Sequence, residues 1–474
     1  MHISKSNLII YLVATTFFME NLDGTVIATA LPEMGNDFGV NAVDVSIGMT
    51  AYLLTLAILI PISGWLADRF GSRAIFTTAI AIFTLASIMC GLSTNLWFFT
   101  AARILQGIGG ALMVPVGRAT VLRSTNKENL INAISLITWP GLVAPVVGPA
   151  IGGFLTTYAS WRWIFFLNVP LGIVGIAFSL WLLKNDQAIE KKPFDTLGFI
   201  LSGITISGLM YTFEVGRHLT GSYIEACIVW GVSSIFGLLT FFHLQRSPHP
   251  LIDLSLLQIP TLSASVWAGS IFRIVLTAVP FLSPLLFQLG FGLDPFDSGL
   301  LVLSIFVGNL AMKSITTPIL NRYGFRNVML LNGGLIVLSI YSCSLISPAL
   351  SFSLIVVTLF FNGAVRSLQF TSLNVIGFSD VPKSKMNSAS SMISTVMQLS
   401  NALGIAFGSL ALSIPVFIRN GAIGSPSIAD FHSAFLYLAA LAVVGILLLM
   451  RLDSDAGSLL RKSPVNLKVG NKRG

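Results

Sequence analysis

Long apolar stretches recur along the chain from its first residues to about residue 450. An α-helix rises 1.5 Å per residue, so about 20 residues are needed to cross the roughly 30 Å hydrocarbon layer of a bilayer. Short segments that hold charges, glycine or proline separate the stretches. The pattern predicts fourteen spanning helices, at residues 8–31, 46–66, 74–92, 96–121, 131–157, 162–183, 197–217, 224–244, 260–288, 298–320, 328–347, 352–375, 387–416 and 431–450.

The composition requires a surface that faces lipid. Hydrophobic residues make up 54% of the 474 residues and charged residues only 10%, whereas soluble domains carry about 25% charged residues. A water-facing surface needs charge however large the core is. The first apolar stretch carries Glu20 and Asp23 and lacks a small-residue cleavage site, so we expect a retained spanning helix rather than a cleaved signal peptide.

Loop charge predicts the orientation. If the N-terminus faces the cytoplasm, 19 of the 27 lysines and arginines fall in inside segments, three in outside loops and five within spans. This asymmetry is the positive-inside pattern, and it predicts that both termini are cytoplasmic. The net charge of +8 lies in these short loops and in the tail after Arg451, so it does not indicate nucleic acid as a partner.

Cysteine and histidine spacing gives no support to a metal site. The three cysteines lie within apolar stretches and their number is odd, which argues against a disulfide framework. The five histidines have no paired-ligand spacing. We therefore predict no metal, no cofactor and no catalytic constellation, and we do not expect an enzyme.

One loop sequence occurs twice. Gly64–Arg73 follows the second predicted helix, and Thr317–Arg326 follows the tenth with Arg, Gly and Arg at matching positions. Duplicated units related by an axis along the membrane normal are a transporter architecture. The repeat predicts six-helix bundles at 1–183 and 260–450, a cytoplasmic linker with an inserted helix pair at 184–259, and a basic tail at 451–474. Asn321 stands in the second copy where the first has Asp68.

Glu20 and Asp23 lie three residues apart in the first predicted helix, and therefore on one face of it. Two carboxylates in an apolar helix do not both stay ionised at low cost. Such a pair suits alternation between a proton and a cationic substrate, with Asp23 as the expected main coupling group. A structural role, in which Asp23 pairs with an arginine such as Arg103, is the open alternative.

The fourth predicted helix carries Arg103, Gln106 and a run of glycines. A charge this deep in a bilayer costs about 3 kcal/mol on insertion scales and should face the bundle interior. No Gly-Lys-Ser/Thr sequence follows the glycines, so the run is not a phosphate-binding loop, and ATP-driven transport loses its main support. Four polar residues within spans are candidates either for lining a central cavity or for bonding between helices: Gln106, Arg273, Arg366 and Gln398.

Two further runs combine glycine with charge or proline. The loop after the second helix offers a tight turn, a carboxylate and basic residues at Gly64, Asp68, Arg69, Gly71 and Arg73. The fifth predicted helix should bend at its prolines, which remove helix hydrogen bonds, and should pack closely through its glycines. A kinked packing helix without a hinge role is the alternative. The residues concerned are Gly141, Pro145, Gly148, Pro149, Gly152 and Gly153.

These runs resemble signatures of the major facilitator superfamily. Gly64–Arg73 is similar to its cytoplasmic loop motif, the run that begins at Arg103 to its proton-coupling motif, and residues 141–153 to the motif that marks its antiporters. Residues 22–32 resemble a signature of its fourteen-helix drug:proton antiporters, with Ala28 in place of the usual asparagine.

Residues 161–172 are similar to a second run of the same antiporter family. Its tryptophans, Trp161 and Trp163, are expected to anchor the chain at the outer membrane interface, because aromatic rings prefer that depth.

The resemblance implies an all-α major facilitator fold in which two six-helix bundles enclose a cavity and the inserted pair is peripheral. It implies proton-coupled efflux of small amphipathic compounds or drugs across the bacterial inner membrane by alternating access. Glu20, Asp23 and Arg103 would then serve in coupling, and the Gly64–Arg73 loop would latch the bundles. The partners are a small-molecule substrate, protons and the bilayer, with a functional monomer. A dedicated metabolite or siderophore exporter and a non-transporting membrane sensor are the alternatives.

Overall fold

The computed structural model describes residues 5–124, 130–183, 193–217, 223–248, 250–382, 385–420, 424–453 and 456–457. Within these ranges the chain is built from helices, and none of the described residues forms a strand. Most of the predicted linker, at 184–192, lies outside the described residues, as does most of the predicted basic tail, from 458 onward.

In chain order the α-helices are α1 (Lys5–Val26), α2 (Leu31–Phe38), α3 (Ala42–Phe70), α4 (Ser72–Gly91), α5 (Leu96–Ser124), α6 (Leu130–Tyr158), α7 (Trp163–Phe166), α8 (Asn168–Leu182), α9 (Thr196–Arg217), α10 (Tyr223–Arg246), α11 (Pro260–Leu285), α12 (Pro295–Tyr323), α13 (Phe325–Cys343), α14 (Phe352–Ile376), α15 (Met386–Asn420) and α16 (Ile428–Leu449). Shorter turns of helix are η1 (Ile27–Thr29), η3 (Leu254–Gln258) and η4 (Leu286–Gly290).

The predicted all-α membrane fold is confirmed. Twelve helices of the described chain are long and apolar enough to cross a membrane: α3, α4, α5, α7 joined with α8, and α9 to α16. Helices α1 and α6 have 22 and 29 residues and are also predicted to span. The carboxylates of α1 lower its mean hydropathy, and the count of fourteen spans stays a prediction.

The first helix ends earlier than its apolar run. The run continues to residue 31, but α1 ends at Val26, and η1 then leads into α2. Pro32 lies in the first turn of α2, where a helix tolerates proline because no N–H is needed there. The residues of η1 are buried, so the hydropathy of the sequence stays high beyond the end of α1.

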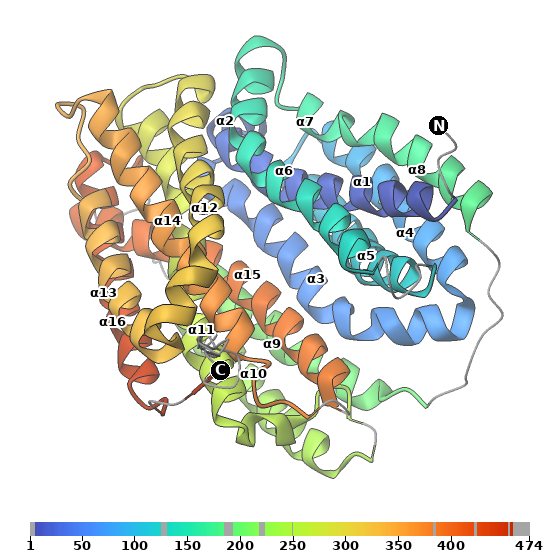
Figure 1. Ribbon diagram of the computed structural model, residues 1–474. Helices are drawn as coiled ribbons and strands as arrows, with labels where there is room; N and C mark the ends of the chain where they lie inside the picture. The colour runs from blue at the N-terminus through green and yellow to red at the C-terminus, as the bar shows by residue number, and fades with distance from the viewer. Residues whose placement is uncertain are drawn as a thin grey trace, which may run out of the picture.

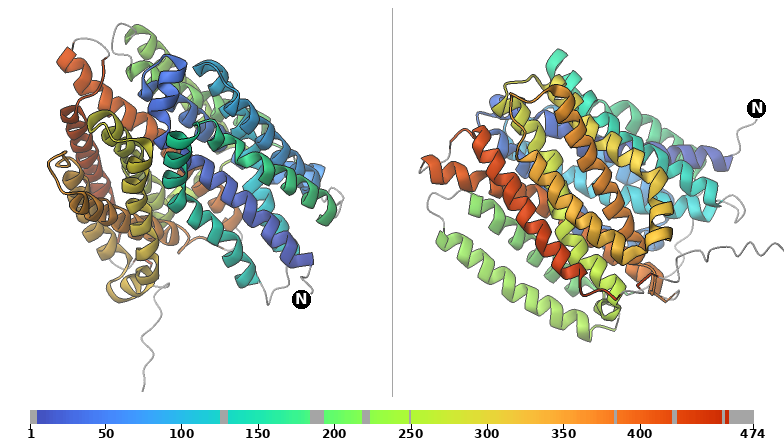
Figure 2. Two further views of the ribbon diagram at one scale, coloured as in Figure 1. Left: turned by 90° about the horizontal axis from the view of Figure 1, so that it is seen from above. Right: turned by 60° about the vertical axis from the view of Figure 1, so that its left-hand side comes forward.

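The spanning helices pack in two groups. Helices α1, α3, α4, α5, α6 and α8 contact one another, and α11 to α16 contact one another. The groups meet where α6 packs on α12 and α3 on α15 (Figure 1). The inserted pair, α9 and α10, packs on itself and reaches the rest through α3 and α15, and it forms an outer layer in Figure 2. The domain boundaries themselves stay predictions.

The loop repeat is visible in the backbone. Gly71, between α3 and α4, has φ +89°, and Gly324, between α12 and α13, has φ +80°. Only glycine adopts such values freely, so both turns require it. Arg73 donates 2.7 Å to a backbone oxygen near the end of α8, and Arg326 donates 3.4 Å to one just past the end of α16. The two copies therefore make the same contact to the last helix of their own group.

Close contact between the groups lies at one end of α6. A side chain on Gly153 would overlap the backbone of Pro295 in the first turn of α12, and one on Gly299 would overlap the carbonyl of Pro149. The Phe296 N–H donates to Thr157 Oγ1 at 3.1 Å. The helices of the two groups touch backbone to backbone here, and this end is opposite the Gly64–Arg73 loop.

Candidate functional site

A buried ion pair joins the first and fourth long helices of the first group. Arg103 Nη1 of α5 lies 2.5 Å from Asp23 Oδ2 of α1, and both side chains are at most 1% exposed. The other carboxylate oxygen accepts hydrogen bonds from Gln106 Nε2 at 2.8 Å and from Asn168 Nδ2 at 3.2 Å. Both oxygens of Asp23 are thus supplied with donors, which offsets much of the cost of burying the charge.

Arg103 is held by several further groups. Its Nη1 also donates to Gln106 Oε1 at 2.5 Å, and its Nε donates to the Gly48 carbonyl at 3.4 Å. The ring of Tyr52 faces the guanidinium at 4.3 Å, a cation–π contact that is strong where water is excluded. The pairing that the sequence left as an alternative for Asp23 is therefore present.

Two members of this network were not predicted as site residues. Asn168 belongs to the run that was expected to act through its tryptophans, and Ser87 lies in an unremarkable apolar helix. Ser87 Oγ accepts from Gln106 Nε2 at 2.9 Å, so α4 joins α1, α5 and α8. An asparagine at the start of an apolar helix indicates that its side chain makes a polar contact. The partner depends on how the helices pack, which the sequence pattern does not show.

Glu20 lies one helical turn from Asp23 in a different environment. It lines a cavity of about 240 Å³ between the two groups. Its Oε2 is buried and finds no hydrogen-bond partner among the described residues. Asp23 on the same helix and Arg118 of α5 are the charged groups that act on it electrostatically. Of the two predicted carboxylates, one is sealed in a network and the other faces an internal space.

The central cavity is built by α1, α3, α6, α11, α12, α14 and α15, so both groups contribute. Tyr52 lines it and also touches Arg103, which places one aromatic ring between the ion pair and the cavity. Nine of the 21 residues that line the cavity are polar, and they come from both groups. These polar residues are Glu20, Asn21, Thr25, Thr29, Tyr52, Thr277, Arg366, Gln398 and Asn401.

The four polar residues proposed from the spans divide into two pairs. Arg366 and Gln398 line the central cavity. Gln106 lies in the buried network around Asp23 and is absent from the lining. Arg273 is buried in α11, where it donates to the Ser265 carbonyl at 3.1 Å and to Asn374 Oδ1 at 2.9 Å. Gln106 therefore links α5 to α1 and α4. Arg273 bonds within α11 and to α14.

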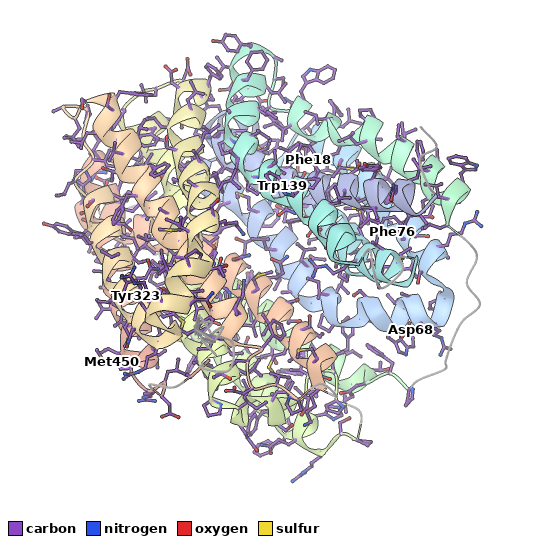
Figure 3. All side chains as sticks on the ribbon, viewed as in Figure 1. Phe18, Asp68, Phe76, Trp139, Tyr323 and Met450 are labelled. Carbon is purple, nitrogen blue, oxygen red and sulfur yellow. The ribbon has the colours of Figure 1, made fainter. Side chains whose placement is uncertain are left out.

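The predicted latch residues lie at a rim of the molecule. Asp68 lies in the last turn of α3, far along the helix from the cavity (Figure 3). The Arg69 guanidinium lies over the Trp65 ring at 5.3 Å, and a side chain on Gly64 would meet open space. Together with Gly71 and Arg73, these residues form the turn and its edge, and none of them lines the cavity.

The glycines of α6 face neighbouring helices. A side chain on Gly148 would overlap Thr25 of α1, and one on Gly152 would overlap the Val26 carbonyl. Gly141 approaches Asn21, also on α1. The prolines at 145 and 149 line the cavity. Helix α6 is continuous through both prolines, and the predicted bend stays a prediction.

The predicted interfacial anchor is wrong for one of its tryptophans. Trp161 is 1% exposed, and its Nε1 donates to Asp37 Oδ2 at 2.8 Å, whereas Trp163 is 55% exposed. Arg162 Nη1 lies 2.5 Å from the same oxygen. The hydrogen bonds from Arg162 and Trp161 hold the pKa of Asp37, which lies outside the spans, below its usual value. The run thus fastens α2 to the turn before α7.

Among the residues that the structure describes, no group of three or more His, Cys, Asp or Glu side chains is placed to hold a metal ion. The site is therefore one of carboxylates, arginines, amides and hydroxyls around a largely apolar space. Such an arrangement binds and releases ions and small molecules.

Comparison with known sequences supports a transport role. The sequence model that describes the Major Facilitator Superfamily matches residues 13–405. The chain is 37% identical over 431 residues to "Putative multidrug resistance protein MdtD" of Serratia proteamaculans, covering 90% of this chain and 89% of that protein. It is 35% identical to the protein of the same name in Yersinia enterocolitica, covering 98% of each.

Solved transporters share the fold at low identity. The nucleoside transporter NupG matches with a TM-score of 0.64 and 15% identity over 94% of this chain and 99% of its own. The inward-open xylose transporter XylE from E. coli matches with a TM-score of 0.63 and 12% identity over 96% of this chain and 99% of its own. At this identity the likeness concerns the fold.

Proposed function

Because this chain belongs to the major facilitator superfamily and is a multi-pass membrane transporter of small molecules, we propose that it exports small amphipathic compounds in exchange for protons. The two helix groups would expose the central cavity alternately to the two sides of the membrane. The naming of its relatives as multidrug resistance proteins supports efflux of drug-like compounds. The cavity, whose lining combines apolar residues with polar side chains from both groups, is of the kind that binds such molecules.

The observation that carries the proposal is the placement of Glu20. Glu20 lines a cavity between the two groups, and its buried Oε2 has no hydrogen-bond partner among the described residues. A carboxylate in this setting is stabilised by a proton, by a cation or by water entering with the cavity opening. A proton and the positive end of a substrate therefore compete for one site, which is the requirement for exchange.

The buried ion pair of Asp23 and Arg103 connects the Glu20 site to the packing of the surrounding helices. Asp23 is fixed to Arg103, and Tyr52 touches both Arg103 and the cavity. A change of charge at Glu20, one turn away on α1, alters the field on that pair. We assign Glu20 the direct exchange of the proton, and Asp23 and Arg103 the linkage of its charge to the packing of α1, α4, α5 and α8.

The proposed location is the bacterial inner membrane, with both termini in the cytoplasm and a single chain as the working unit. The cytoplasmic side is then the one that carries the Gly64–Arg73 loop. Labelling of single cysteines introduced at Lys191 and Gly424 tests this orientation, because the charge pattern puts these positions on opposite sides. Labelling of both from the same side would contradict it.

The experiment on function uses purified protein in proteoliposomes under an imposed pH gradient. A panel of fluorescent amphipathic compounds is screened for accumulation against its gradient. Wild-type protein should accumulate at least one of them, and Glu20→Gln, which keeps the volume but not the proton, should not. Asp23→Asn should also lose uphill transport, because it breaks the charge balance with Arg103. Substrate accumulation that ignores the pH gradient would contradict the proposal.

A further inference from the structure

The two helix groups repeat a motif inside the membrane. Arg103 and Gln106 lie three residues apart in α5, and Arg366 and Gln369 lie three residues apart in α14. The helices occupy matching places, since α5 contacts α1, α3 and α4 while α14 contacts α11, α12 and α13. The positions of this pair in the second group thus correspond to those of the buried network in the first.

The glutamines make matching contacts. Gln106 Nε2 reaches across to Ser87 of α4, and Gln369 Oε1 accepts from Asn332 Nδ2 of α13 at 2.9 Å. Each glutamine is fully buried and ties the motif helix to the helix that follows the repeated loop. The two arginines are therefore comparable in position, and any difference between their surroundings is informative.

The two groups differ in whether an acidic residue lies close to the arginine. Helix α11, which corresponds to α1, contains neither aspartate nor glutamate, and neither do α13 and α14. The Nε and Nη1 atoms of Arg366 are buried and find no hydrogen-bond partner among the described residues. The rings of Phe306 and Phe370 lie beside its guanidinium, with centroids 5.8 and 5.2 Å from the guanidinium carbon. Asp23 neutralises Arg103, whereas no acid among the described residues forms an ion pair with Arg366.

Arg366 also differs from Arg103 in facing the central cavity, which Glu20 lines from the other group. A guanidinium does not lose its proton in proteins, so it keeps its charge in this setting. Burying a charged group without a partner is costly. A group of opposite charge that enters with a ligand removes this cost, and a carboxylate forms strong charge-assisted hydrogen bonds with a guanidinium.

We propose that the cavity selects zwitterionic amphipathic molecules, with an anionic group bound by Arg366 and an amine bound by Glu20 in place of its proton. This rests on the proposed function and narrows its substrate class. The apolar lining between the poles, which includes Leu53, Phe281 and Val302, takes the body of the ligand. The amides of Gln398 and Asn401 supply hydrogen bonds beside it.

The test is a binding experiment on the full chain in lipid nanodiscs. Four ligands share one naphthalene body and carry a carboxylate and an amine, only the amine, only the carboxylate, or neither. Isothermal titration should find the zwitterion about tenfold or more tighter than the amine-only compound, since one charge-assisted contact is worth at least that factor. Equal or tighter binding of the amine-only compound would overturn the proposal.

Variants assign the effect to its residue. Arg366→Met should abolish the preference for the carboxylate, and Arg366→Lys should retain part of it. The matched control is Arg273→Gln, which removes another buried arginine that does not line the cavity and should leave the order of the four ligands unchanged. Because Arg366 makes no hydrogen bond to described residues, Arg366→Met should unfold at the same temperature as wild type or higher. A retained carboxylate preference in folded Arg366→Met would overturn the assignment.

Proton-driven flux of each ligand, measured separately in proteoliposomes, keeps the two proposals distinct. If flux is coupled to the pH gradient but all four ligands bind alike, only the charge selectivity is lost. If no ligand moves with the pH gradient, the transport proposal fails instead.

Discussion

At the scale of the residue, two carboxylates one turn apart have opposite surroundings. The spacing of Glu20 and Asp23 predicts a shared face of one helix, and no more. Asp23 meets Arg103, Gln106 and Asn168 because α5 and α8 pack against α1 at its level, whereas Glu20 lines a cavity. Sequence spacing within one helix is fixed by its pitch, but contacts between helices depend on packing that no local pattern encodes.

Asn168→Ala tests the unpredicted member of the network. The substitution removes a donor from a buried carboxylate, which costs about 1–3 kcal/mol of stability. We expect a lower unfolding temperature in detergent and slower transport. Ser160→Ala, in the same segment but outside the network, is the control. Wild-type stability of Asn168→Ala would show that Asp23 does not depend on this hydrogen bond.

The contact between Asp37 and Arg162 should not sense pH in the working range. Its stabilisation is present above the ordinary pKa of aspartate, about 3.9, and is lost as the pH falls through the lowered pKa in the folded protein. The difference in unfolding temperature between wild type and Asp37→Asn should therefore be constant from about pH 5 to 8. A difference that grows or shrinks across this interval would contradict the ion-pair account.

At the scale of the element, the helix pattern and the glycine-rich runs were the most predictable features. Periodic apolar stretches located the long helices to within a few residues, with the end of α1 as the main exception. The glycines of α6 were expected to allow close packing, and the structure adds that Gly148 and Gly152 meet α1 while Gly153 meets α12. The spacing of Arg103 and Gln106 recurs at Arg366 and Gln369 in the sequence. Only the structure shows that Arg103 has an acid partner and that Arg366 has none among the described residues.

Gly148→Ala should separate α6 from α1. The added methyl group would overlap Thr25, and α1 carries the carboxylates that the proposed mechanism uses. We expect a several-fold slower rate of exchange with the protein still folded in the membrane. Gly231→Ala in α10 is the matched control, because a methyl group there meets open space. Equal rates for the two variants would argue that α1 and α6 do not need this close approach.

At the scale of the whole molecule, the two groups touch backbone to backbone at one end of α6 and α12, while the repeated loops lie toward the other. The loop repeat predicted the two groups, because duplication of a helix unit leaves a trace in the sequence. The size and lining of the cavity could not be foreseen, since seven helices from distant parts of the chain contribute to it.

Asp68→Asn should slow the transport of every substrate to a similar degree. Asp68 lies in the last turn of α3, at the rim, and does not line the cavity, so it does not contact a ligand bound there. Transport rates for a panel of compounds should fall by a common factor, with unchanged binding affinities. Loss of one compound alone would place Asp68 in recognition rather than in movement.

The central claim is that substrate and proton exchange at one site. In the most direct measurement, a substrate gradient drives the movement of protons. Proteoliposomes are loaded with a transported compound, no pH gradient is imposed, and a pH-sensitive dye inside reports proton movement. Outward flow of the compound should drive protons inward and acidify the lumen, and Glu20→Gln should abolish this proton movement. Substrate flow without acidification in the wild-type protein, or undiminished acidification in Glu20→Gln, would contradict the account.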